Sequence, residues 1–145
     1  MPLLPRKGAL AIAAVVDVAL QDQGHPISAK TLAARHGLPP RHLEPVLQAL
    51  VRDGILKGIR GPHGGYELGR DRRQVTAGDI LRAAGTVEDG GELSNGSELI
   101  SQVVLPALSN AELEFGIALS RINVDDMARS AETLTPPTSA SATRA

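Results

Sequence analysis

Cysteine is absent from the 145 residues of this sequence, and aromatic side chains are nearly absent. Without thiols the chain can form no disulfide, no thiolate metal site and no cysteine nucleophile, and it suits a reducing compartment. Tyr66 and Phe115 are the aromatic residues, yet hydrophobic residues make up 42% of the chain. A core of Leu, Val, Ile and Ala favours closely packed helices. The length fits one domain, or one domain with an added oligomerisation element.

Long hydrophobic runs are also missing near the start, where a targeting segment would lie. Arg6-Lys7 followed by Gly8–Val16 imitates a secretory signal, but Asp17 interrupts the run and no small-residue cleavage site follows. The run is far shorter than the roughly twenty apolar residues that a bilayer span needs. We therefore expect a cytoplasmic protein with no membrane partner.

The formal net charge of −1 conceals an uneven distribution along the chain. Residues 1–85 carry twelve Lys and Arg against seven Asp and Glu, a balance of +5, whereas residues 86–145 carry three against nine, a balance of −6. A basic front half indicates an anionic partner for that half. The alternative is an uneven distribution without a function.

Three predicted helix starts share one signature, an N-cap residue flanked by a hydrophobic staple. The N-caps are Ser28, Thr76 and Asn123, with the staple pairs Ile27 and Leu32, Val75 and Ile80, and Ile122 and Met127. Acidic residues in the first turn, such as Asp79, suit the positive end of the helix dipole. Upstream, Ala9–Leu20 is apolar nearly all round and predicts a buried helix.

Two short helices and a hairpin are predicted between residues 28 and 69. The first helix ends at Gly37, and the second begins after Leu38-Pro39-Pro40 and ends at Asp53-Gly54. On the second helix the apolar face is formed by Leu43, Val46, Leu47, Leu50 and Val51, and the opposite face by Arg41, Glu44, Pro45, Gln48 and Arg52. Gly58–Gly69 then holds five glycines between two short strands and lacks the Lys-Ser/Thr pair of a phosphate loop. This order predicts a winged helix-turn-helix.

The rear of the chain predicts an oligomerisation element. After a short helix over Thr76–Ala84 comes a loop, residues 85–96, and then a long amphipathic helix over Ser97–Arg121 in which Pro106 either makes a kink or marks the true start. We expect its apolar stripe to pair with a second copy through Ile100, Val104, Leu108, Ala111, Phe115 and Leu119. The predicted organisation is a DNA-binding domain over 1–84, the loop, the dimerisation and closing helices over 97–132, and a disordered tail over 133–145.

These motifs resemble the Rrf-two family of bacterial winged helix-turn-helix transcriptional regulators. Arg60–Tyr66 matches the wing motif of that family, and Leu43-Glu44 matches its recognition helix. Val75–Leu81 and Ile122–Met127 resemble the segments after the wing and at the close, the latter with Asn in place of the customary Thr. The resemblance implies a mainly α fold with a small β-hairpin wing and a long C-terminal dimerisation helix.

The resemblance also implies a homodimer that binds double-stranded DNA, and we expect a repressor, or occasionally an activator, on a near-palindromic operator. Recognition helices enter successive major grooves, and wings reach toward the minor groove. The expected DNA-binding residues are Ser28, Lys30 and Thr31, then Pro40, Arg41, His42, Glu44 and Gln48, and in the wing Arg60, Gly61, His63, Gly64 and Tyr66.

Each of these roles has a plainer alternative. Glu44 can accept from a cytosine amino group, or it is a solvated charge or a clamp on Arg41 or Arg52. Ser28 can contact phosphate or only cap its helix. His63 is as readily a mere tip residue, and Tyr66 is favoured as packing at the base of the wing.

Two departures from the family pattern matter. Many members hold an iron–sulfur cluster on three cysteines before the dimer helix, but residues 85–105 contain none, so we expect no such cofactor. Glu88, Asp89, Glu92 and Glu98 offer a hard-cation alternative, with a solvated loop favoured over it. In the recognition helix, Pro45 cannot donate a backbone hydrogen bond, so base contacts expected from the family can be displaced.

A protein-interaction adaptor is the competing function, because winged helices also serve that role and the acidic rear half offers a surface. No nucleophile, base and orienting group can be assembled into an enzyme site. The effector, a small molecule or a partner protein, is not indicated by the sequence.

Overall fold

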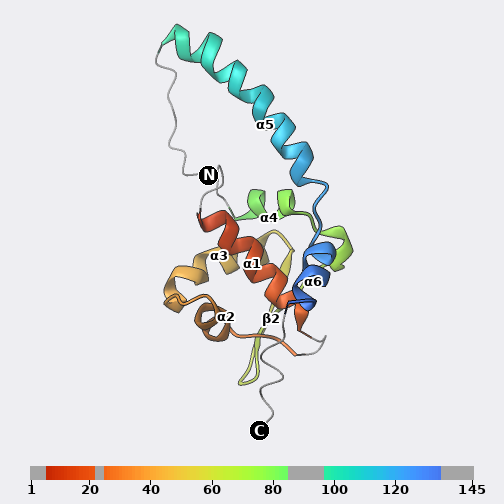
Figure 1. The fold of residues 1–145 in the computed structure, drawn as a ribbon. Coiled ribbons are helices and arrows are strands. Elements are labelled where there is room, and N and C mark those ends of the chain that lie inside the picture. The colour runs from red at the N-terminus through yellow and green to blue at the C-terminus, as the bar shows by residue number, and fades with distance from the viewer. Residues whose placement is uncertain (1–5, 22–24, 85–96, 135–145) are drawn as a thin grey trace.

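The computed structural model describes residues 6–21, 25–84 and 97–134 (Figure 1). The elements in chain order are α1 (Arg6–Leu20), α2 (Ala29–Arg35), α3 (Pro40–Arg52), β1 (Leu56–Ile59), β2 (Gly65–Leu68), η1 (Arg72–Gln74), α4 (Ala77–Ala83), η2 (Ile100–Val104), α5 (Leu105–Leu119) and α6 (Val124–Glu132). The mainly helical fold with one hairpin is confirmed. The predicted loop 85–96 and all but the first two residues of the predicted tail lie outside the described residues.

Helix α1 runs through the centre of the body, which we define as residues 6–84 together with α6 (Figure 1). Ala11, Ala14, Val15 and Val18 are buried, and α4, α6 and the hairpin pack around them. Small alanines let the neighbouring helices approach closely. The apolar character of residues 9–20 thus reflects a core helix.

Helices α2 and α3 form the predicted helix-turn-helix. Ser28 caps α2, and Gly37 turns the chain in the left-handed region with a φ of 65°. On α3, Leu43, Val46, Leu47 and Leu50 are buried, each worth about 1.5–3 kcal/mol of transfer free energy. Pro45 lies inside α3 on its exposed side, and the helix continues past it.

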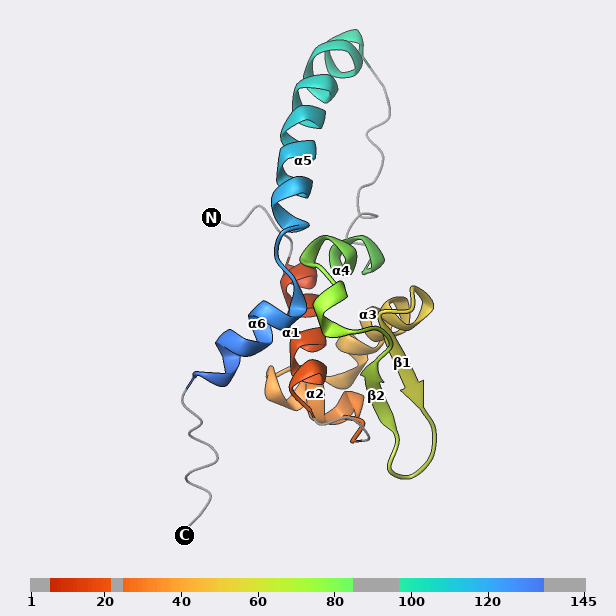
Figure 2. The ribbon, with the colours of Figure 1, turned by 90° about the vertical axis from the view of Figure 1, so that its right-hand side faces the viewer.

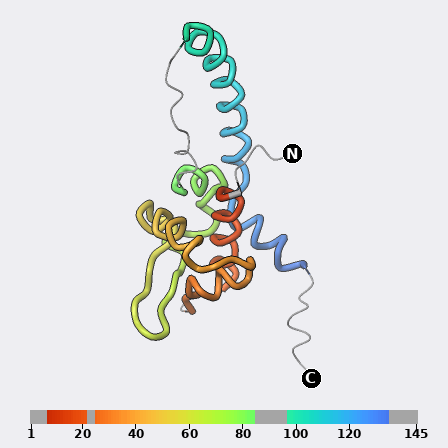
Figure 3. The backbone as a smooth tube through the Cα atoms, turned by 90° about the vertical axis from the view of Figure 1, so that its left-hand side faces the viewer, coloured from red at the N-terminus to blue at the C-terminus, as the bar shows by residue number. Residues whose placement is uncertain are grey.

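The hairpin pairs β1 with β2 in antiparallel register, from Leu56 opposite Leu68 to Ile59 opposite Gly65. Figures 2 and 3 show its tip pointing away from the rest of the body, at the end opposite α5. The base of the hairpin is anchored by Leu56, which is buried, and by Tyr66 and Leu68, which pack against the core.

The chain segments before α4 and before α6 lie side by side. The Ala77 N–H donates to the Ile122 carbonyl at 2.8 Å, and the Val124 N–H donates to the Val75 carbonyl at 2.8 Å. Thr76 and Asn123 cap the two helices, as predicted, and Thr76 forms a full capping box with Asp79. This junction joins the end of α5 to the body.

The arm, residues 98–119, is helical throughout and stands away from the body (Figures 1 and 2). Pro106 lies in the first turn of α5, one of the two predicted alternatives, but the helix extends upstream through the π-helical η2. In that wider turn the Leu105 N–H donates to the Ile100 carbonyl. No helix in the described ranges is long and apolar enough to cross a membrane.

Candidate nucleic-acid interface

The exposed side of α3 forms a continuous polar surface. We call it the reading face, and it consists of Pro40, Arg41, His42, Glu44 and Gln48, all exposed. Because Leu43 and Leu47 on the opposite side are completely buried, the helix cannot rotate without exposing its core residues. The fold therefore fixes which side chains of α3 are offered to a partner.

The start of α2 presents short polar side chains. The Ser28 hydroxyl accepts from the Thr31 N–H at 3.0 Å and donates to the Thr31 hydroxyl at 3.0 Å, so its capping role is confirmed. Lys30 and Thr31 are exposed. A role of these three residues at phosphate stays a prediction.

The hairpin tip is slim and basic. Arg60, Gly61 and His63 are exposed, whereas Gly64 is half-buried. Gly61 has a φ of 108°, a conformation that side chains disfavour, so glycine is required in this turn. Tyr66 is half-buried against the core, which supports its predicted packing role.

A pair of backbone hydrogen bonds attaches the hairpin to the start of α2. The Ile27 N–H donates to the Tyr66 carbonyl at 3.1 Å, and the Tyr66 N–H donates to the Ile27 carbonyl at 2.9 Å. An open hollow of about 550 Å³ lies between them, bordered by Ser28, Thr31, His63 and Gly64. The α2 start and the hairpin tip thus belong to one surface, which the sequence did not indicate because Ile27 and Tyr66 are distant in the chain.

Ion pairing separates the arginines of this surface from those of η1 and α6. Across the described part of the chain, Arg41 and Arg60 enter no ion pair, whereas Arg72 and Arg129 do. Among the described residues Glu44 likewise has no ion-pair partner, so the clamp on Arg41 or Arg52 is not formed. Unpaired exposed arginines are the groups that bind phosphates and guanine edges.

Asp17 has a structural role that the sequence analysis missed. Its carboxylate lies 2.7 Å from His36 Nε2 and 3.5 Å from Arg35 Nη1. The contact ties α1 to the turn between α2 and α3. A lone acid within an apolar helix was the only sequence signal.

The arm offers the second candidate surface. Of the six residues predicted at the dimer interface, Leu108 is 56% exposed and Phe115 38% exposed. Every residue of α5 is at least partly exposed, including apolar ones such as Leu113 and Ile117. An apolar helix of this kind is covered by a partner in most proteins.

The fold defines the class, a winged helix-turn-helix protein whose second helix exposes a polar face. The sequence profile of Rrf2, described as an iron-dependent transcriptional regulator, matches residues 4–130. The chain belongs to the Rrf2 family of transcriptional regulators. The family assignment favours a regulator over the adaptor alternative.

Three similar proteins illustrate the relationship. A putative HTH-type transcriptional regulator of Haemophilus influenzae is 39% identical over 80 residues, 55% of this chain and 53% of that protein. The structure of CymR, the global cysteine regulator of B. subtilis, has a TM-score of 0.67 at 27% identity and covers 90% of this chain and 98% of that one. The structure of T. potens IscR has a TM-score of 0.70 at 27% identity and covers 99% and 94%. The chain spans about half the length of the first curated relatives that it matches.

An iron–sulfur cluster of the usual kind does not fit the residues of this chain. Protein iron–sulfur clusters are held mainly by cysteine thiolates, and the chain has no cysteine. The part that the structure describes also contains no group of three or more His, Asp and Glu that could hold a metal ion. The acidic residues 88, 89 and 92 of the hard-cation alternative lie outside the described residues.

Proposed function

We propose that this protein is a homodimeric, sequence-specific DNA-binding repressor that acts in the cytoplasm on a near-palindromic operator and has no enzymatic activity. One observation carries the proposal. The reading face of α3 and the hairpin tip hold exposed arginines that pair with no acid in the described part of the chain, and the apolar residues of the arm are exposed.

The reading face suits the major groove. A groove about 12 Å wide admits a helix, and side chains near its start reach base edges. Arg41 lies in the first turn of α3 and Glu44 one turn further on. Arg41 donates to guanine and Glu44 accepts from the amino group of cytosine, so together they specify a G·C pair or adjacent pairs.

The hairpin suits the minor groove beside it. The narrow tip carries Arg60, and a narrow minor groove concentrates negative potential that attracts arginine. Gly61 adds no side chain that would hold the backbone away from the DNA. Lys30 and Thr31 at the start of α2 contact the phosphates between the two grooves.

Dimerisation through the arm accounts for the two-fold symmetry expected of the operator. Pairing the apolar faces of two arms covers the exposed Leu108 and Phe115 and places two reading faces on one duplex. Half-sites are then expected one helical turn apart or a multiple of it.

Selection from random duplex DNA tests the proposal. The wild-type protein is expected to enrich a sequence with two inverted half-sites, and binding is expected to weaken steeply with salt. Glu44→Ala is expected to relax one position of each half-site by about tenfold. Glu112→Ala on α5, also an exposed acid, is the matched control and keeps the wild-type preference. A folded wild-type protein that enriches no sequence contradicts the proposal.

A further inference from the structure

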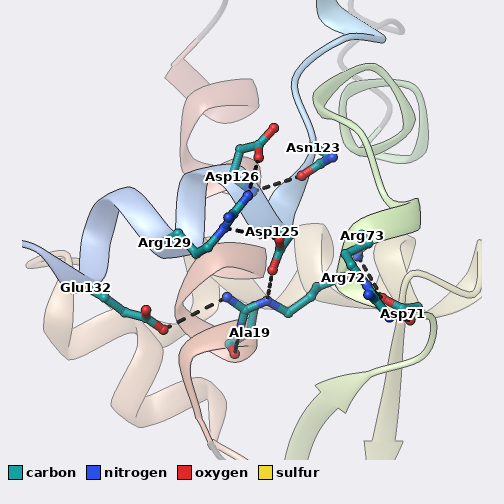
Figure 4. A network of polar contacts seen from close by, with 9 residues as sticks. All are labelled: Ala19, Asp71, Arg72, Arg73, Asn123, Asp125, Asp126, Arg129 and Glu132. Carbon is teal, nitrogen blue, oxygen red and sulfur yellow. Dashed lines mark hydrogen bonds and ion pairs between the residues drawn. The ribbon is translucent and has the colours of Figure 1, made fainter.

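One arginine joins three segments that are far apart in the sequence (Figure 4). Arg72 Nε donates to Asp125 Oδ1 at 2.8 Å, and its Nη1 donates to the Ala19 carbonyl at 3.1 Å. Its Nη2 lies 3.9 Å from Glu132 Oε2. The guanidinium thus links η1, the end of α1 and both ends of α6.

This arginine is held in place rather than free at the surface. Its side chain is 26% exposed, against 72% for the neighbouring Arg73, which pairs with Asp71 only two residues away. Asp125 is held from its other side by Arg129 at 3.2 Å. A planar guanidinium can serve several acceptors at fixed angles, which a lysine ammonium cannot do.

All three acceptors of Arg72 belong to the body, and two of them, Asp125 and Glu132, lie on the helix that follows the arm. Helix α6 follows α5 after a short turn, and η1 follows β2 of the hairpin. Backbone hydrogen bonds between residues 75–77 and 122–124 attach the turn after the arm to the body, and the Arg72 contacts attach α6, the next helix, to η1 and α1. The arm is thus followed by a helix that Arg72 holds against the rest of the body.

We propose that Arg72 is a positioning residue that fixes the angle between arm and body, and that this angle sets the half-site spacing which the dimer accepts. The inference rests on the proposed function. Helix α5 has 15 residues and is about 22 Å long. A rotation of about 10° at one end of such a rod moves the other end by about 4 Å, close to the rise of roughly 3.4 Å per base pair. A loosened junction therefore tolerates spacers that differ by one base pair.

The spacer preference of the full chain tests this inference. The duplexes carry the selected half-sites at their native spacing, at spacings one and two base pairs shorter or longer, and as a single half-site. Wild-type protein is expected to prefer the native spacing by about tenfold or more, because the second half-site is then reached at high effective concentration. Arg72→Met is expected to lose most of that preference and to bind the single half-site as the wild type does.

Two further variants sharpen the result. Asp125→Asn keeps the shape of the side chain and the contact of Arg72 with Ala19, and it is expected to loosen the spacer preference even if Arg72→Met fails to fold. Arg73→Met is the matched control, since the hydrogen bonds of the Arg73 side chain in the described structure go to its neighbour Asp71, and it keeps the wild-type profile. Sedimentation is expected to show the same dimer for all.

The outcomes separate the two proposals. A wild-type protein with no gain from a second half-site contradicts the proposed function. If folded variants at residues 72 and 125 keep the spacer preference of the wild type, that result overturns the role of Arg72. Equal weakening on every duplex, the single half-site included, also overturns it, because that result indicates a merely structural contact.

Discussion

Two sets of arginines in this molecule have opposite surroundings. Arg41 on α3 and Arg60 at the hairpin tip are exposed, and in the described ranges neither enters an ion pair. Arg72 and Arg129 at the junction are held by the carboxylates of α6. Arginine thus has two roles in this molecule. At α3 and the hairpin tip its guanidinium is available to an outside anion, and at α6 and η1 it is engaged in internal ion pairs. The difference teaches that internal ion pairs engage Arg72 and Arg129, whereas Arg41 and Arg60 stay available to an outside anion.

The comparison predicts that removing the unpaired arginines changes binding and not stability. Arg41→Ala combined with Arg60→Ala is expected to lower DNA affinity by at least about thirtyfold, since each contact is worth about 1–3 kcal/mol. The free energy of unfolding is expected to stay within about 0.5 kcal/mol of the wild type. Fluorescence anisotropy with labelled DNA and chemical denaturation measure the two quantities.

Arg121→Ala is the control for that pair of changes. Arg121 is exposed near the foot of the arm and forms no ion pair within the described residues. It lies away from the reading face, so its loss is expected to leave affinity unchanged. If Arg121→Ala weakened binding as much as the double variant, the distinction between the two regions would fail.

A smaller effect is expected where the hairpin meets α2. A Cβ added at Gly65 would lie 2.5 Å from the Ile27 carbonyl carbon, and the φ of 152° disfavours other residues. Gly65→Ala is expected to cost about 1–3 kcal/mol of folding free energy, as overpacking does, and to weaken DNA binding by displacing the tip.

Gly58→Ala in the same hairpin is the matched control. A Cβ at Gly58 would meet no atom within 4 Å, so stability and binding are expected to change little. Thermal unfolding compares the two variants. If both variants lost equal stability, the loss would come from a change anywhere in the hairpin and not from its attachment to Ile27.

The smallest effect is expected at Asp71. A side-chain hydrogen bond from Arg73 holds the pKa of Asp71 below its ordinary value of 3.8. Because the folded-state pKa is lowered, the contact favours the folded state at neutral pH, and this contribution is lost as the pH falls through the lowered pKa. Arg73→Ala is expected to return the pKa toward 3.8, with DNA affinity unchanged. An NMR titration of the Asp71 carboxyl measures this pKa. A pKa that does not move in the variant contradicts the role given to the Arg73 hydrogen bond.

Features set by neighbouring residues could be predicted from the sequence. The caps at Ser28, Thr76 and Asn123 are confirmed, because a cap needs only the residues of one turn. The amphipathic pattern of α3 likewise identified its buried and exposed sides. Both predictions rest on periodicity and backbone chemistry within a few residues.

Features set by distant residues could not be predicted. Arg72 and Asp125 are separated by 53 positions, and nothing local distinguishes Arg72 from Arg73. The bridge between Ile27 and Tyr66 also requires the fold, although the glycine at position 65 marks the close approach. For Pro106, the sequence allowed either a kink within a long helix or the start of a helix. In the structure the π-helical turn before Pro106 joins the residues upstream to α5, so the helix continues on both sides of the proline. The DNA-binding residues and the dimer interface stay predictions.

The most direct measurement is NMR mapping of the DNA contact surface. Amide shifts of labelled protein are recorded as a duplex with the selected half-sites is added. The account predicts changes concentrated at residues 28–31, 40–48 and 60–64, with α6 and the exposed part of the body around α4 little affected. Changes centred on α4 and α6, with the reading face unmoved, would contradict it.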